Sequence, residues 1–120
     1  MKVLVVDDEV EVGNFLCVFL ERLGLVTEKA NSGKEAIDVF NRTKPDWMLL
    51  DVKMPDMDGI EVLRKIKETN KDIKVIMITG KDDEMTENEA QSLGARDYLI
   101  KPVDLDELRA KVQKYIIKGE

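Results

Sequence analysis

The sequence of 120 residues contains no histidine and one cysteine, and its formal net charge is −6. Without histidine, the chain has no Ser-His-Asp or Cys-His nucleophile pair and no histidine ligand for zinc. A single cysteine excludes an internal disulfide or a thiolate metal site. The remaining chemistry is that of carboxylates, lysines and hydroxyls, which favours hard cations and phosphate.

Length and composition predict one globular domain over residues 1–120, because 43% of the residues are hydrophobic and 37% are charged. The longest apolar run, residues 15–20, is too short to span a membrane. Acidic residues from Asp7 onwards interrupt the apolar start, which argues against a signal peptide. We therefore expect a cytoplasmic protein without membrane contact, and the acidic balance argues against direct nucleic-acid binding.

Short apolar or β-rich segments alternate with stretches long enough for helices. The segments cover residues 2–6, 25–30, 46–50, 74–78 and 97–100. The stretches between them carry helical apolar spacing and pairs spaced as capping boxes, namely Ser32 with Glu35, Asp58 with Glu61 and Asp104 with Glu107. This alternation predicts parallel strands joined by right-handed crossovers. The polar stretch 81–89 offers few apolar anchors for the fourth helix, which we expect to pack loosely.

The pattern within each segment predicts its place in the sheet. Residues 3–6, 47–50 and 75–78 are continuously apolar, as in central strands, whereas 26–30 is mixed and 98–100 is short, as at sheet edges. With helices on both faces, the expected strand order is 2-1-3-4-5. The fold class is therefore α/β: a three-layer, flavodoxin-like, doubly wound five-stranded parallel sheet. Ligands in such folds bind beyond the carboxyl ends of the strands at the switch point, here between strands one and three.

Polar residues follow the predicted strands at that edge: Asp7 and Asp8 after the first, Asp51 after the third, Thr79 after the fourth and Lys101 after the fifth. Carboxylates about 5 Å apart repel by roughly 3 kcal/mol per pair at an effective dielectric near 20. Such a cluster requires a cation or raised pKa values. Mg²⁺ suits it, with a phosphoryl group completing the coordination. Asp7 and Asp8 could instead cap the first helix, and we assign Asp58 to a cap and leave Asp56 outside the site.

Several spaced motifs resemble the receiver domain of two-component response regulators, of the single-domain chemotaxis or sporulation type, over the whole chain. They are Asp7-Asp8-Glu9, residues 49–59 around Asp51, Thr79-Gly80, and residues 98–102 ending in Lys101-Pro102. The resemblance implies a phosphorelay switch in which Asp51 is the phosphoacceptor. Its carboxylate would attack a phosphohistidine on a partner histidine kinase or histidine phosphotransferase. The absence of histidine fits a donor histidine on another protein.

The resemblance also implies how the cofactor Mg²⁺ is held. Asp8 and Asp51 would bind the ion directly, together with the main-chain carbonyl of Lys53, while Asp7 would act mostly through water. Thr79 and Lys101 would contact phosphoryl oxygens.

Further residues would carry the signal away from the site. Thr79 and Tyr98 would form the conformational switch, and the Lys101–Pro102 bond would be cis, an isomer that is accessible before proline. The output surface would be the fourth helix, fifth strand and fifth helix. It would act on a downstream protein or an output domain missing from this chain, with the receiver as a monomer or a phosphorylation-dependent dimer.

The first predicted helix offers a candidate kinase-docking patch. Val10, Asn14 and Cys17 fall on the side opposite its apolar core face. Receiver domains commonly present this helix to the histidine-bearing helices of the kinase, so these residues are possible contacts. Scattered exposed apolar residues are also normal on a surface and provide the simpler interpretation.

Three other functions compete with the switch. A small metal-dependent phosphatase with Asp7 as nucleophile needs an aspartate two positions later, where Glu9 stands. A flavin or nucleotide carrier needs a hydroxyl- or glycine-rich loop after the first strand, and the acidic run there would repel a phosphate. A non-phosphorylated, protein-binding receiver is disfavoured because every expected site position is filled. The leading hypothesis is a phosphoacceptor switch. Such a switch has no external turnover substrate and is therefore not an enzyme in the usual sense.

Overall fold

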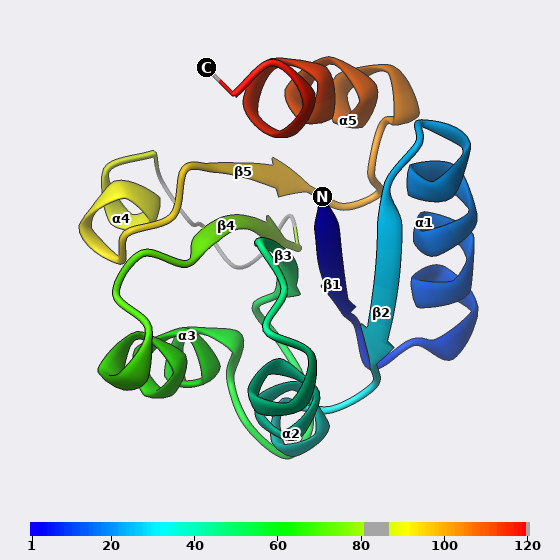
Figure 1. Cartoon of the computed structure of the whole chain (residues 1–120). Coiled ribbons are helices and arrows are strands. Elements are labelled where there is room, and N and C mark those ends of the chain that lie inside the picture. Colours follow the sequence, from blue (N-terminus) through cyan, green and yellow to red (C-terminus); the bar gives the residue numbers. More distant parts are fainter. Residues whose placement is uncertain (81–86, 120) are drawn as a thin grey trace.

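The computed structural model describes residues 1–80 and 87–119, apart from the side chain of Glu87. Its elements, drawn in Figure 1, are β1 (Lys2–Val6), α1 (Val10–Arg22), β2 (Val26–Ala30), α2 (Gly33–Thr43), β3 (Trp47–Asp51), α3 (Gly59–Thr69), β4 (Lys74–Thr79), α4 (Glu87–Ser92), β5 (Asp97–Ile100), α5 (Leu105–Lys111) and the π-helical continuation η2 (Val112–Ile117). The predicted strand segments differ from the observed strands by at most one residue at either end. The expected loose packing concerns the polar stretch 81–89, most of which lies outside the described residues.

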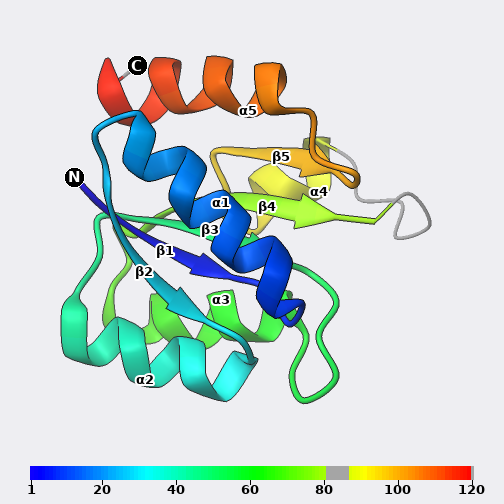
Figure 2. The ribbon, with the colours of Figure 1, turned by 90° about the vertical axis from the view of Figure 1, so that its right-hand side faces the viewer.

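All neighbouring strands pair in parallel, and the sheet order is β2-β1-β3-β4-β5. The predicted three-layer architecture and strand order are therefore confirmed. Figures 1 and 2 show α1 and α5 on one side of the sheet and α2 and α3 on the other. Strands β1 and β3 are neighbours although their helices α1 and α3 cover opposite faces, which places the switch point between their carboxyl ends.

Two apolar layers hold the helices onto the sheet. Side chains alternate between faces along a strand, so Leu4 and Val6 of β1 pack toward α2 and α3 while Val3 and Val5 pack toward α1 and α5. This two-sided burial explains why the central strands read as continuous apolar runs. Among the described residues, no helix is both long and apolar enough to cross a lipid bilayer.

The predicted helix starts are confirmed by side-chain hydrogen bonds. Ser32 Oγ accepts from the backbone N–H of Glu35 at 3.1 Å. Asp58 accepts from Ile60 N–H, and Asp104 accepts from the N–H groups at positions 106 and 107. These bonds satisfy first-turn donors that would otherwise lack partners.

The placement of Cys17 on an exposed side of α1 is wrong. Cys17 is buried, and it lies in the same apolar layer as Leu16 and Leu20. The buried face of α1 also includes Gly13, where an added Cβ atom would lie 3.6 Å from the Lys29 side chain of β2. Because the edge strand β2 runs beneath this side of the helix, the face that packs on the sheet extends further round α1 than the apolar spacing indicates.

Candidate functional site

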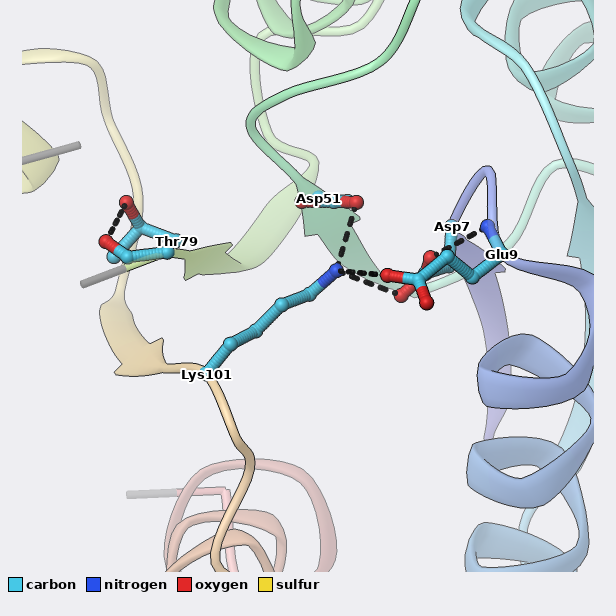
Figure 3. Close-up of polar contacts among 6 residues, drawn as sticks. Asp7, Glu9, Asp51, Thr79 and Lys101 are labelled. Atoms are coloured by element: carbon cyan, nitrogen blue, oxygen red, sulfur yellow. Dashed lines mark hydrogen bonds and ion pairs between the residues drawn. The ribbon is translucent and has the colours of Figure 1, made fainter. Parts of the chain in front are cut away.

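The side chains predicted from the ends of the strands meet at the carboxyl edge of the sheet (Figure 3). Asp51 is the last residue of β3 and Thr79 the last of β4, while Asp7 directly follows β1 and Lys101 directly follows β5. Asp7, Asp51 and Thr79 are the buried polar residues of the described chain, each at most 2% exposed. Burial of polar groups at one edge of an otherwise apolar sheet marks this edge as the candidate site.

Three carboxylates converge there. One oxygen from each of Asp7, Asp8 and Asp51 can be chosen so that all three atoms lie within 4.8 Å of one another. This separation matches the distance assumed from the sequence, at which each ionised pair repels by roughly 3 kcal/mol at an effective dielectric near 20.

The Lys101 ammonium group lies among these acids. Its Nζ donates to Asp51 Oδ2 at 3.1 Å and lies 3.4 Å from Asp7 Oδ2. It also lies 3.6 Å from an oxygen of Glu9, as Figure 3 shows. Glu9 was not among the predicted site residues, although it belongs to the Asp7-Asp8-Glu9 motif. Its position, directly after the two aspartates, was the available signal.

Burial dominates the ionisation of the cluster. Burial raises the pKa of Asp51 to about 6, against the lowering effect of Lys101, and the neighbouring Asp7 charge adds to the rise. The pKa of Asp7 is also raised by burial, although the Glu9 N–H and the Lys101 ammonium oppose the rise. Burial lowers the pKa of Lys101, but the carboxylates of Asp51, Asp7 and Glu9 together hold it above its ordinary value. One lysine thus compensates the cluster only in part.

The residues present fit a magnesium ion. Asp7 Oδ1 accepts from the Glu9 N–H at 2.9 Å, which leaves its second oxygen directed elsewhere. This second oxygen, Asp7 Oδ2, is buried. Within residues 1–80 and 87–119 it accepts no hydrogen bond of normal geometry, although the Lys101 ammonium group is close. A buried anionic oxygen without a hydrogen bond, beside two further carboxylates, is the donor set that Mg²⁺ prefers. The alternative role of Asp7 or Asp8 as the N-cap of α1 does not hold, since Glu9 is the N-cap residue.

Close packing against α3 fixes the position of Asp51. The Gly59 N–H donates to the carbonyl of Val52 at 2.7 Å and closes the loop between β3 and α3. A Cβ atom at Gly59 would overlap the carbonyl oxygen of Asp51 and lie 3.0 Å from the Cα of Val52. Glycine is therefore required here for a close backbone approach.

The residues expected to form the switch lie on neighbouring strands. The Thr79 hydroxyl donates to the carbonyl of Gly80 at 3.4 Å (Figure 3). Tyr98 on β5 is half-buried and packs against the apolar layer that covers the α2 and α3 face. The Lys111 ammonium donates to the Tyr98 carbonyl at 3.0 Å. The peptide bond between Lys101 and Pro102 is cis.

Two of the three proposed docking residues are exposed. Val10 is 49% exposed and Asn14 is exposed as well, whereas Cys17 is buried. Burial also raises the pKa of the Cys17 thiol.

A groove of about 600 Å³ runs beside α1 to the segment after β5. Its lining is mainly apolar and consists of Val12, Phe15, Leu16, Pro102, Val103 and Leu105, together with Glu9, Glu11 and Lys101. This groove therefore reaches the carboxylate site at Glu9 and Lys101.

Asp56, which was left outside the predicted site, has a structural role in the loop between β3 and α3. Its carboxylate accepts from the backbone N–H groups of Gly33 at 3.0 Å and Lys34 at 3.1 Å. These bonds hold the pKa of Asp56 below its ordinary value. No local spacing connects Asp56 with a helix more than 20 positions earlier, so only the tertiary structure reveals this contact.

A family model described as "Response regulator receiver domain" matches residues 3–113 of the chain. The chain belongs to this family. The receiver domain is 37% identical over 115 residues to "Sporulation initiation phosphotransferase F" of Bacillus subtilis, which covers 96% of this chain and 93% of that protein. It is 40% identical over 113 residues to "Regulatory protein AtoC" of Escherichia coli, of which the chain spans only 24%. Several transcriptional and response regulators that it matches are about twice its length.

Solved structures agree with this assignment. The receiver domain superimposes with a TM-score of 0.84 and 32% identity on response regulator TrrA from Thermotoga maritima in complex with Mg²⁺-BeF, covering 96% of this chain and 98% of that one. The family expected from the motifs is thus confirmed, and with it the function of a phosphoacceptor domain in two-component signalling. The acidic cluster of Asp7, Asp8 and Asp51 is consistent with a magnesium-dependent phosphorylation site.

Proposed function

We propose that residues 1–120 form one receiver domain in which Asp51 accepts the phosphoryl group. The observation that carries this assignment is the position of Asp51 at the switch point, buried beside two further aspartates and within 3.1 Å of Lys101. A carboxylate oxygen of Asp51 would attack the phosphorus of a phosphohistidine on the partner. The bond from phosphorus to the imidazole nitrogen would break, and its electron pair would stay on the partner histidine.

The remaining site residues would prepare this transfer. Asp8, Asp51 and the Lys53 carbonyl would hold Mg²⁺ directly, with Asp7 acting mostly through water. The ion, when bound, neutralises charge on the phosphoryl oxygens. Lys101 would pair with one phosphoryl oxygen and the Thr79 hydroxyl would donate to another. Because phosphorylation changes only this chain, the domain would act as a switch without an external turnover substrate.

Labelling with acetyl phosphate tests the assignment. In the presence of Mg²⁺, intact mass spectrometry is expected to show one acid-stable, base-labile phosphoryl adduct on the wild type and none on Asp51→Asn. The matched control is Asp38→Asn, at an exposed position on α2, which should label like the wild type. An unlabelled wild type, or an undiminished adduct on Asp51→Asn, would rule out Asp51 as the acceptor. An adduct mapped to Asp7 would favour the phosphatase-like alternative.

The groove beside α1 supports a docking site for the histidine-bearing helix of a kinase or phosphotransferase. We place phosphotransfer between the two proteins in the cytoplasm. The groove is mainly apolar and ends at Glu9 and Lys101, so a helix lying in it would bring its histidine next to Asp51. Val10 and Asn14 remain proposed contacts on α1, but neither lines this groove, and Asn14 lines a separate hollow beside β2. With Cys17 buried, Phe15 is the better candidate for an apolar contact, since it is 55% exposed and lines the groove.

Substitution of Val10 tests whether the kinase also contacts α1 at this exposed residue. Val10→Glu is expected to slow phosphotransfer from the histidine kinase at least several-fold while leaving acetyl phosphate labelling unchanged, because the small donor does not need the surface. Val26→Glu provides the control, since Val26 is 58% exposed but lies at the far end of β2. Equal kinase rates for Val10→Glu and Val26→Glu would count against docking at Val10.

Tyr98 and Thr79 are proposed to carry the change from Asp51 to the surface formed by α4, β5 and α5. This surface would engage a downstream protein, an output domain or a second receiver. We expect Tyr98→Ala to label normally with acetyl phosphate but to lose the change in hydrogen exchange that phosphorylation produces over residues 97–119. Tyr98→Phe, which retains the ring, should keep that change. Loss of labelling together with the exchange response would contradict a switch role.

A further inference from the structure

The loop that joins β3 to α3 is bonded to the first turn of α2. The Asp56 carboxylate accepts from the N–H groups of both Gly33 and Lys34, one with each oxygen. The N–H of the next residue, Glu35, is satisfied by Ser32. Two of the first three donors of α2 are therefore satisfied by a side chain from another part of the chain. Bonds from a helix N-terminus to a carboxylate are also favoured by the helix dipole.

The same loop packs tightly against α2 next to these bonds. A Cβ atom at Gly33 would lie 2.6 Å from the Cβ of Met57 and 3.0 Å from Val62 Cγ2. Met57 itself packs against the apolar layer on the α2 and α3 face. Figure 2 shows this loop, in green, extending from the end of β3 toward the start of α2. The contact between Asp56 and α2 is thus part of a packed interface.

The loop is held at both of its ends as well. At its base, the Gly59 N–H donates to the Val52 carbonyl, and Asp58 caps α3 through the Ile60 N–H. Lys53 lies between the base and Asp56, and its main-chain carbonyl is a ligand in the proposed magnesium site. A magnesium ion requires nearly ideal octahedral geometry, so a main-chain ligand must be held in place before the ion binds.

We propose that Asp56 is a positioning residue that holds the β3–α3 loop, and with it the Lys53 carbonyl, in the geometry that Mg²⁺ binding requires. Asp56 does not touch the ion or the phosphoryl group. It acts through the loop, as groups behind the direct ligands do in other metal sites, where their loss commonly costs about 10–100-fold in metal affinity. The inference rests on the proposed function, because it assumes that the site binds Mg²⁺ through the Lys53 carbonyl.

Calorimetric titration of the unphosphorylated chain with Mg²⁺ tests this role without measuring phosphorylation. Asp56→Ala is expected to weaken Mg²⁺ binding about tenfold relative to the wild type. Ser32→Ala is the matched control, since it removes a 3.1 Å bond from the same helix turn without releasing the loop. It should bind Mg²⁺ within about twofold of the wild type. Asp56→Asn, which retains one acceptor oxygen, should recover part of the affinity.

The titration distinguishes the absence of a magnesium site from the absence of a positioning role for Asp56. A wild type that binds no Mg²⁺ would overturn the proposed metal site itself. A wild type that binds Mg²⁺, with Asp56→Ala and Ser32→Ala equally affected or equally unaffected, would overturn only the positioning role. Denaturant unfolding of all variants accompanies the titration, because a merely structural role of Asp56 predicts lower stability with unchanged Mg²⁺ affinity.

Discussion

In magnesium-free buffer at pH 7.5, Asp51→Asn is expected to melt at a higher temperature than the wild type. Asp51 is 2% exposed, and burial raises its pKa from 3.8 to about 6, so its ionised form is disfavoured in the folded chain despite Lys101. A rise of that size corresponds to roughly 3 kcal/mol of destabilisation at neutral pH. Asparagine has nearly the same shape and no charge, so the melting temperature should rise by roughly 12 °C.

The pH dependence of this stability difference follows from the raised pKa of Asp51 in the folded chain. Well below pH 3.8, Asp51 is protonated in both the folded and the unfolded chain, and the substitution should have little effect. Between about pH 4 and pH 6 the unfolded chain loses the proton first, so the wild type is progressively destabilised as the pH rises. The advantage of Asp51→Asn should therefore grow over this range and level off above it.

Magnesium should reduce the difference in melting temperature between Asp51→Asn and the wild type. In the proposed site Mg²⁺ would compensate the three carboxylates of the wild type and would bind more weakly to Asp51→Asn, so millimolar Mg²⁺ should narrow the gap in melting temperature. Asp38→Asn, at an exposed position, is the control for removal of a charge alone. If Asp51→Asn melts at or below the wild-type temperature without Mg²⁺ at pH 7.5, burial and the neighbouring carboxylates do not disfavour the ionised form of Asp51 as the structure indicates.

The fold could be predicted almost completely because its determinants are local. A strand buried on both faces must be apolar at every position, and an edge strand need not be, so residues 47–50 and 26–30 already indicate the sheet order. The order in turn brings the ends of β1 and β3 together. The sequence therefore predicts that Asp51 lies beside Asp7 and Asp8, although it follows them by more than 40 positions.

The errors concern contacts that depend on tertiary packing. Cys17 was assigned to the exposed side of α1 because apolar spacing gives the direction of the core but not the width of the buried face. The neighbouring edge strand β2 widens that face. Asp56 was treated as an ordinary loop acid because its partners, Gly33 and Lys34, belong to a different helix. In both cases the deciding neighbour comes from a distant part of the chain.

Gly59→Ala is expected to be strongly destabilising. Two effects of opposite sign compete, because alanine is intrinsically favoured over glycine within a helix by up to about 1 kcal/mol. Against this, a Cβ atom here would overlap the Asp51 carbonyl oxygen and lie 3.0 Å from the Asp51 carbonyl carbon. The neighbours are backbone atoms of the central strand and its extension, which cannot move aside as a flexible side chain can. The overlap should therefore dominate, with a net loss of about 2–4 kcal/mol in the free energy of unfolding.

The same substitution at Gly13 provides the matched control. A Cβ atom at Gly13, within α1, would find the Lys29 side chain at an ordinary 3.6 Å, so Gly13→Ala should leave the stability unchanged or raise it slightly. Urea unfolding measures both variants, and acetyl phosphate labelling should also slow in Gly59→Ala because relief of the overlap displaces Asp51. Equal stabilities of the two variants would mean that the chain tolerates a side chain behind Asp51, and the close approach of α3 would then not be what fixes Asp51 in place.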